Sequence, residues 1–171
     1  MMEIDQFKLD DDGKVPNHSK FPLLIYHGPF LQSGSVLSSS KVIDTFTANG
    51  WRGTWENGIF PYHHYHARSH EVLANVGGPV EVQFGGSSGP VLTFHPGAVV
   101  IIPAGVGHCR ISNDGALAIV GAYPAGQENC DIKSADNPAH YELAKQEILQ
   151  VALPDQDPVT GKKGPLLDHW I

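Results

Sequence analysis

The chain has 171 residues, 41% of them hydrophobic, and this length is typical of one domain with a sizeable core. Its formal charge of −7 at pH 7 argues against nucleic-acid binding, which needs a basic surface, and no basic amphipathic helix suited to a membrane surface is evident. Because there is no signal-peptide pattern, no apolar run of transmembrane length and no CxxC pair, we expect a cytoplasmic protein without a disulfide framework.

The amino-terminal quarter of the chain predicts an arm, an extended segment and one helix. Residues 1–20 are polar, so we expect a loosely held, flexible arm ahead of a single domain over residues 21–171. Residues 21–31 are apolar but contain two prolines, which favours an extended segment lying against the domain. From about residue 37 to 49, apolar residues recur at helical spacing and Gly50 can end the helix, so we predict a short helix outside the sheets.

The stretch from residue 58 to 78 is unusual because it places four of the ten histidines within eight residues. His64 and His66 are separated by one residue, so on a β-strand both imidazoles face the same side. Glu71 follows after four residues, which is enough chain for a turn that returns a carboxylate to the same point. Imidazole and carboxylate groups bind divalent first-row metals. We interpret the other two histidines of the stretch, His63 and His70, as hydrogen-bonded or surface residues.

Aromatic residues precede these histidines. Tyr62 has the parity of His64, so on a continuous strand its hydroxyl would point into the same cavity, and Tyr62 is a candidate substrate contact. Pro61 can break that alternation. For Trp51 and Trp55 we favour core or interface packing over the alternative of an aromatic wall for a ligand.

A second stretch offers a third imidazole. Residues 99–102 are a continuous apolar run, typical of a strand buried on both faces, and a turn with Pro103 and Gly105 leads to a strand that opens at His108. A sheet can bring this imidazole beside the first two. Arg110 has the parity of His108, and two alternatives are open: its guanidinium anchors a carboxylate or phosphate inside, or it pairs with a surface acid at the barrel mouth.

The remaining segments predict further strands and a helical end. Residues 80–94 alternate between apolar and polar and contain a Gly-rich turn, so they predict a hairpin. Residues 116–123 predict another strand, and residues 137–151 an amphipathic helix. Residues 154–171 are rich in Pro and Gly yet end in apolar residues, so we expect this tail to dock on its own barrel or on a second subunit.

At these two stretches the sequence resembles the cupins. Their first motif, G(X)5HXH(X)3-4E(X)6G, is matched by Gly58, His64, His66, Glu71 and Gly78. Their second motif, G(X)5PXG(X)2H(X)3N, is matched by Gly97, Pro103, Gly105 and His108, with Ser112 in place of the final Asn. Over about residues 20–170 the chain is similar to the YjlB-like branch of small cupins, as in Asn57-Gly58-Ile59, Phe84-Gly85-Gly86 and Pro103-Ala104-Gly105.

The resemblance implies a fold and a metal site. The fold is all-β: a double-stranded β-helix, or jelly-roll barrel, over about residues 51–124, with one or two peripheral helices and a carboxy-terminal helix and docking tail over residues 137–171. One divalent transition metal ion, either iron, manganese, nickel or zinc, would be bound by four ligands. These metal ligands are His64, His66, Glu71 and His108.

These observations predict a metal-dependent enzyme that acts on a small organic molecule in the barrel cavity. The ion would either polarise an oxygen atom of the substrate for isomerisation or decarboxylation, or be an iron centre of a dioxygenase. The alternative is a non-catalytic protein that binds or senses a small ligand. We expect a homodimer because of the apolar tail, and no nucleic-acid or membrane partner.

Overall fold

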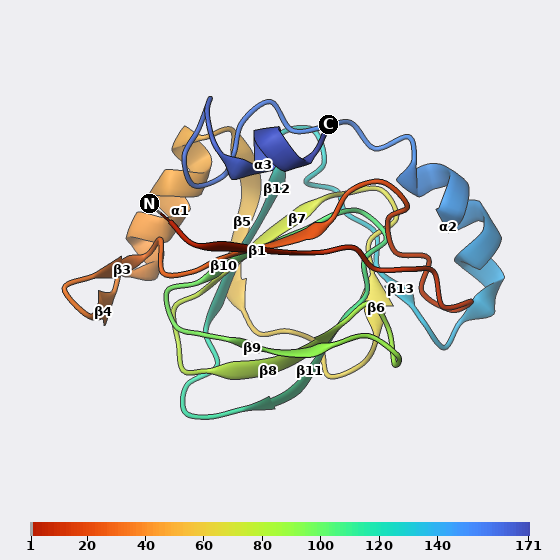
Figure 1. Ribbon diagram of the computed structural model, residues 1–171, viewed down its shortest axis with the longest axis horizontal. Helices are drawn as coiled ribbons and strands as arrows, with labels where there is room; N and C mark the ends of the chain where they lie inside the picture. The colour runs from red at the N-terminus through yellow and green to blue at the C-terminus, as the bar shows by residue number, and fades with distance from the viewer. Residues whose placement is uncertain (1) are drawn as a thin grey trace.

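A computed structural model describes residues 2–171. Two antiparallel β-sheets of six and five strands pack face to face, and a small hairpin of β3 (Leu31–Gln32) and β4 (Ser35–Val36) projects at one side (Figure 1). The all-β fold class predicted from the motifs is confirmed.

The two sheets have the following strands. The six-stranded sheet runs in the order β1 (Ile4–Phe7), β2 (Leu23–Tyr26), β10 (Val99–Ile102), β7 (Glu71–Asn75), β12 (Ile119–Pro124) and β5 (Trp51–Asn57). The five-stranded sheet runs in the order β13 (Lys133–Ser134), β6 (His64–Tyr65), β11 (His108–Asn113), β8 (Val80–Phe84) and β9 (Val91–Phe94). From β9 to β13 the chain alternates between the two sheets, so segments that are far apart in the sequence become neighbours in space.

One hydrophobic core lies between the sheets. On β8 the apolar residues Val80, Val82 and Phe84 are buried and alternate with two polar residues, as the period of a strand requires. They belong to the same buried cluster as Val100 and Ile102 of β10 in the opposite sheet. This packing forms one end of the interior between the sheets. The predicted histidine ligands lie at the other end.

The outer face of the six-stranded sheet is also covered. Helix α1 (Ser39–Ala48) packs Val42 and Phe46 against it, and the short helix α3 (Pro165–His169) adds Leu166. All four residues of β10 are therefore buried, which confirms the prediction of a strand buried on both faces. Gly50 follows α1 with φ of +81°, the left-handed conformation expected for its end.

A third cluster covers the end of the sandwich near β6. The predicted helix over residues 137–151 is a 3₁₀ turn (Pro138–His140) followed by α2 (Tyr141–Ile148). Ala144 and Ile148 of α2 pack against Tyr65 of β6. α2 thereby covers the strand that contributes the first histidines.

The amino-terminal segment differs from the loosely held arm that its polarity predicts. Residues 4–7 pair with β2 along their whole length, and Val15 is fully buried. The buried side chain of Asn17 donates to the carbonyl oxygens of Asp10 and Gly85 and accepts from the N–H of Gly107. Strand pairing, the hydrogen bonds of Asn17 and scattered apolar contacts such as that of Val15 hold this segment, so its mostly polar composition did not reveal it.

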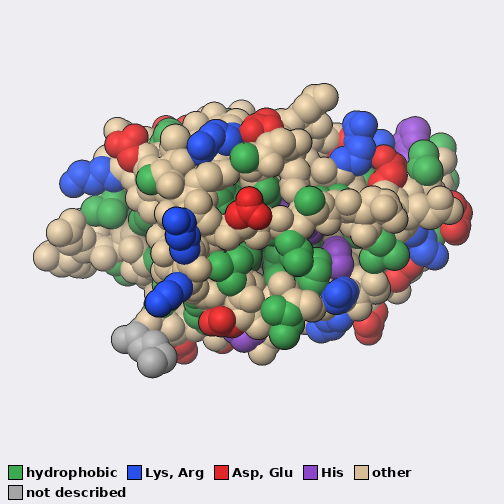
Figure 2. All heavy atoms as spheres, turned by 90° about the horizontal axis from the view of Figure 1, so that it is seen from above, with side chains coloured by type: hydrophobic (Ala, Val, Ile, Leu, Met, Phe, Trp, Pro, Cys, Tyr) green, Lys and Arg blue, Asp and Glu red, His purple; other side chains and the backbone are tan. Residues whose placement is uncertain are grey.

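The helices of residues 2–171 are short. α1 has ten residues, and none of the helices within the described range has the length and apolarity needed to cross a membrane. On the face drawn in Figure 2, the Lys and Arg side chains are scattered among acidic ones, and histidine side chains are visible between hydrophobic ones right of centre.

Candidate metal centre

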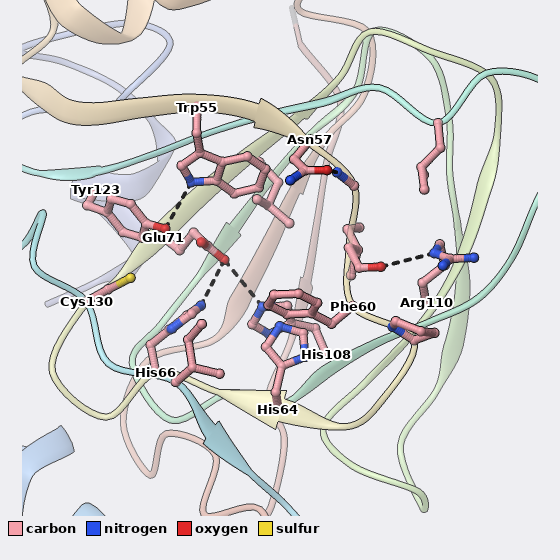
Figure 3. Close-up of a pocket in the computed structure, with 16 residues that line it drawn as sticks. Trp55, Asn57, Phe60, His64, His66, Glu71, His108, Arg110, Tyr123 and Cys130 are labelled. Carbon is pink, nitrogen blue, oxygen red and sulfur yellow. Dashed lines mark hydrogen bonds and ion pairs between the residues drawn. The ribbon is translucent and has the colours of Figure 1, made fainter.

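The strand pairing brings the predicted ligands together at one end of the sandwich. His64 of β6 and His108 of β11 are direct cross-strand partners, and their ring centroids lie 4.1 Å apart. His66 follows β6, and Glu71 begins β7 in the opposite sheet. Figure 3 shows the three imidazoles and the carboxylate converging on one point.

The three imidazoles have the geometry and tautomer of metal ligands. All three are buried, and each offers a ring nitrogen that lies within 4.8 Å of the other two. Each Nδ1 also contacts a backbone carbonyl oxygen: His64 that of Tyr62 at 2.9 Å, His66 that of Asp131, and His108 that of Val106 at 3.1 Å. A carbonyl only accepts hydrogen bonds, so Nδ1 carries a hydrogen and Nε2 is the nitrogen left to bind a metal, which would replace any proton on it. Three fixed imidazoles with Nε2 left for binding fit a divalent transition metal.

Glu71 occupies a position suited to the fourth ligand. Its Oε1 lies 3.4 Å from Nε2 of His66 and 3.3 Å from Nε2 of His108. With bonds of about 2.1 Å, neighbouring ligands around one ion are separated by about 3.0–3.4 Å. The carboxylate therefore fits the same ion as these two imidazoles.

The electrostatics of the cluster favour a cation. Burial opposes ionisation of Glu71, but the charge of His66 and hydrogen bonds from His108 and His66 lower its pKa overall. Burial also opposes a charged His66, yet the charge of Glu71 raises the pKa of His66 well above its usual value. Burial and the neighbouring His108 lower the pKa of His64 to about 3, so this ring is neutral at pH 7, as a ligand must be.

A cavity of about 370 Å³ lies beside the cluster. Its walls are mostly apolar and include Trp55, Ile59, Phe60, Leu73, Leu117 and Ile132. Its polar side chains, besides the four predicted ligands, are Asn57, Arg110, Tyr123 and Cys130. Phe60 and Ile132 are about half exposed, at 47% and 50%, and so mark the rim. The cluster is thus accessible to a small molecule.

Tyr62 does not line this cavity. Its side chain is 40% exposed, and its ring stacks on Phe60 with centroids 5.2 Å apart. The expectation assumed a continuous strand up to His64, but β5 ends at Asn57 and β6 begins only at His64. Pro61 interrupts the alternation between them, so parity does not carry over to Tyr62.

Arg110 does line the cavity. Its Nε donates to the carbonyl oxygen of Ile59 at 3.0 Å, and its Nη1 donates to Oδ1 of Asn113 at 3.3 Å. None of the ion pairs found among residues 2–171 involves Arg110. Pairing with a surface acid, one of the two alternatives for this residue, is therefore absent from the described part of the chain.

Two cavity residues had no role in the sequence analysis. Tyr123 of β12 accepts a hydrogen bond from Nε1 of Trp55 at 2.9 Å, and burial and the charge of Glu71 raise its pKa, so its hydroxyl is neutral. Cys130 lies in the loop after β12, where hydrogen bonding to His66 lowers its pKa. No motif marks either residue. The sequence feature that could have pointed to this part of the cavity was Trp55, which is one of two tryptophans just before the first motif.

Asp131 fixes His66 from outside the cavity. Its carbonyl oxygen accepts from His66, while its buried carboxylate accepts the backbone N–H groups of Ala67 at 3.0 Å and Arg68 at 2.9 Å. The loop after β12 is thereby fastened to the turn after β6. Such contacts orient a ligand imidazole and set its tautomer.

The other two histidines of the first stretch lie outside the cluster. His70 is fully buried, and its Nδ1 accepts the N–H of Ala104 at 2.9 Å, which confirms its interpretation as a hydrogen-bonded residue. His63 is half-buried and does not belong to the group of converging imidazoles.

Comparison with known proteins gives one full-length relative. No family model matches the chain. The chain is 40% identical over 169 residues to uncharacterized protein YjlB of Bacillus subtilis (strain 168), and the alignment covers 99% of this chain and 98% of that protein.

Solved structures give more distant similarities. They include a DMSP lyase (13% identity, 67% of this chain, 43% of that chain, TM-score 0.37) and procruciferin, an 11S globulin from Brassica napus (12% identity, 78% and 27%, TM-score 0.39). A mutant of Bacillus subtilis oxalate decarboxylase aligns at 18% identity over 95% of this chain and 37% of that chain, with a TM-score of 0.35. The chain spans less than half the length of each of these solved chains.

From its identity to YjlB over nearly the whole of both proteins, and from its two histidine motifs on antiparallel sheets, we conclude that the chain belongs to the YjlB-like family of cupins.

Proposed function

We propose that the protein binds one divalent first-row transition metal ion through His64, His66, His108 and Glu71, and that it is a metal-dependent enzyme. The observation that carries this proposal is the orientation of the three imidazoles. Each has its Nδ1 held by a backbone carbonyl, so that Nε2 is the nitrogen left for a metal at the wall of an open cavity. An open site of this kind, with ordered ligands and an apolar cavity beside it, is typical of catalysis on a small organic molecule.

When bound, such an ion supplies Lewis-acid chemistry for an isomerase or decarboxylase, or redox chemistry for a dioxygenase. The protein's own contribution comes from the cavity. The apolar side chains exclude water from a bound molecule, and Tyr123 presents a neutral hydroxyl beside the ligands. This hydroxyl accepts from Trp55 and is hydrogen-bonded to Cys130, so a bound molecule would compete with the thiol for its hydrogen.

One observation favours the alternative of a non-catalytic binding protein. Among the described residues that line the cavity, the only His, Asp and Glu side chains are the four predicted ligands. A proton-transfer reaction would therefore depend on Tyr123 or Cys130, because the groups used most often as general bases are occupied by the metal. A binding protein needs no such group.

Elemental analysis of protein purified without a metal-binding tag tests the metal centre. We expect close to one equivalent of iron, manganese, nickel or zinc in the wild type, and loss of most of it in His66→Ala, since this variant removes one of the four proposed ligands. Iron would direct a screen for O₂ uptake with catechols, thiols and diketones. The other metals would direct a screen for isomerase, decarboxylase and hydrolase activities.

His63→Ala is the matched control, because it removes an imidazole from the same stretch but outside the cluster, and it should retain the metal. If the wild type contains no metal and takes up none on reconstitution, the proposal fails. A metal-loaded protein that binds small molecules but turns none over would instead establish the binding protein.

A further inference from the structure

The cavity has an uneven distribution of polar groups. In Figure 3 the metal ligands lie in the middle of the view, with Tyr123 on one side of them and Arg110 on the other. On β11, Arg110 is two residues beyond His108 and on the same face, about 7 Å along the strand. The apolar residues that line the same cavity include Ile59, Leu73 and Leu117.

The Arg110 side chain is fixed in place, yet its charge has no partner. Its backbone N–H donates to the carbonyl of Phe60 and its side-chain Nε to that of Ile59, so the segment before β6 holds both the main chain and the side chain of Arg110. With one hydrogen of Nη1 directed to Asn113, both hydrogens of Nη2 and one of Nη1 remain for a ligand.

The charge balance around this arginine is unusual for a chain with 18 acidic and 11 basic residues. Within residues 2–171, no carboxylate forms an ion pair with its guanidinium, and the only acidic group that lines the cavity is Glu71, the predicted metal ligand. An oriented guanidinium in an apolar cavity binds carboxylate strongly and with defined geometry.

We propose that the cavity takes a small organic acid with an apolar body, whose anionic group is bound by Arg110 while the far end of the molecule faces the metal ligands. This inference rests on the proposed function, because it assigns the substrate class of the same site. It is favoured over a neutral substrate because the half-buried guanidinium of Arg110 has no carboxylate partner among residues 2–171, and an anionic group offers the two acceptor oxygens that a neutral molecule lacks. It commits the carboxylate to Arg110 rather than to the metal.

Calorimetric titration of the metal-loaded protein tests the assignment, with phenylacetate as the probe and phenylacetamide as its neutral counterpart. We expect phenylacetate to bind at least about tenfold more tightly than the amide. Arg110→Gln should abolish this preference while leaving the affinity for the amide unchanged, because Gln can still donate to the carbonyl of Ile59. In a series from propionate to hexanoate, the affinity should rise about fourfold for each methylene group that is buried against the apolar wall.

Arg52→Gln is the matched control. The Arg52 guanidinium also donates to backbone carbonyls, those of Thr47 and Trp51, but it does not line the cavity. This variant makes the same change in charge and should keep the preference for phenylacetate. Arg110→Lys should keep only part of it, since Lys retains the charge but loses the planar pair of donors.

Two results overturn the inference. One is that phenylacetate binds no better than the amide. The other is that its preference survives in Arg110→Gln, which would place the carboxylate on the metal. The metal content of each sample separates these results from failure of the proposed function: a metal-free protein that still needs Arg110 for phenylacetate would refute the enzyme but retain the anion site.

Discussion

At the scale of single residues, backbone contacts decide the state of each buried imidazole. In the three metal ligands, Nδ1 donates to a carbonyl. His18 is the opposite case, because its Nδ1 accepts the N–H groups of Lys20 at 3.1 Å and Phe21 at 2.9 Å. A protonated ring cannot accept at Nδ1. Burial, together with the charges of Lys8 and Lys20, lowers the pKa of His18 to about 4, so the fold requires a neutral ring.

This requirement predicts a specific loss of stability in acid. The unfolded chain titrates at His18 near the ordinary value of 6.5 and the folded chain at about 4, so the contribution is complete above pH 6.5 and is lost as pH falls toward 4. The full loss amounts to about 3 kcal/mol. In His18→Asn the amide oxygen can accept the same two N–H groups but does not titrate. Urea unfolding at pH 7, 5.5 and 4 should therefore show a smaller loss in the variant than in the wild type, by about 2–3 kcal/mol.

His95→Asn provides the control for this comparison, because His95 is exposed and the same substitution there should reproduce the wild-type acid dependence. An equal loss of stability in His18→Asn and wild type would show that the buried ring does not need to be neutral.

At the scale of elements, a β-bulge determines the wall of the cavity. β12 pairs with β5 so that Gly121 is opposite Trp55, but Tyr123 is opposite Arg52, which leaves one extra residue on β5. Gly53, with φ of +65°, lies at this bulge. The Trp55 ring packs over the bare backbone of Gly121 and its Nε1 reaches the Tyr123 hydroxyl. The bulge and Gly121 therefore bring the side chains of Trp55 and Tyr123 together.

Gly121→Ala should disrupt this wall. A Cβ at this position would lie 2.2 Å from two carbon atoms of the Trp55 ring, while the backbone of Gly121 is not left-handed, so the effect is purely one of packing. We expect a loss of stability of about 1–3 kcal/mol and a changed tryptophan fluorescence as the ring is displaced. In a Trp55→Phe background the clashing atoms are absent and the same substitution should cost less. An equal cost in both backgrounds would contradict the contact.

The difference between local sequence patterns and long-range strand pairing explains which parts of the site the sequence could predict. The ligand spacing of His64 and His66 depends only on the period of a strand, and the turn before His108 is set by its own Pro and Gly. The pairing of Trp55 with Tyr123 joins residues 68 positions apart and depends on a shifted register, which no local pattern encodes. Tyr62 was placed by parity across a proline, where parity no longer applies.

At the scale of the whole molecule, the carboxy-terminal tail completes the outer core. The Trp170 ring stacks on Phe21 with centroids 5.4 Å apart, and its Nε1 donates to the carbonyl of Pro22 at 2.9 Å. The Tyr26 hydroxyl donates to Asp157 at 2.6 Å. Of the two alternatives for the tail, the structure has it on its own sheet. The homodimer therefore stays a prediction, without the support that the tail was expected to give.

Trp170→Ala should reveal how much this docking stabilises the fold. The side chain is 2% exposed, so its removal leaves a cavity against Phe21 and an unpaired carbonyl at Pro22. We expect a loss of about 3–5 kcal/mol in the free energy of unfolding, measured with urea. Ile171→Ala is the control, because that side chain is 80% exposed and its truncation should change the stability by less than about 0.5 kcal/mol.

The dependence of the unfolding midpoint on protein concentration shows whether the tail docks on its own chain or on a second copy in solution. If the tail packs on its own chain, the difference between wild type and Trp170→Ala should be the same at low and high protein concentration. If copies exchange their tails, association is linked to folding, so the wild-type midpoint should rise with concentration and Trp170→Ala should remove that rise. A concentration-dependent midpoint that persists in Trp170→Ala would instead indicate a dimer formed through another surface, independent of the tail.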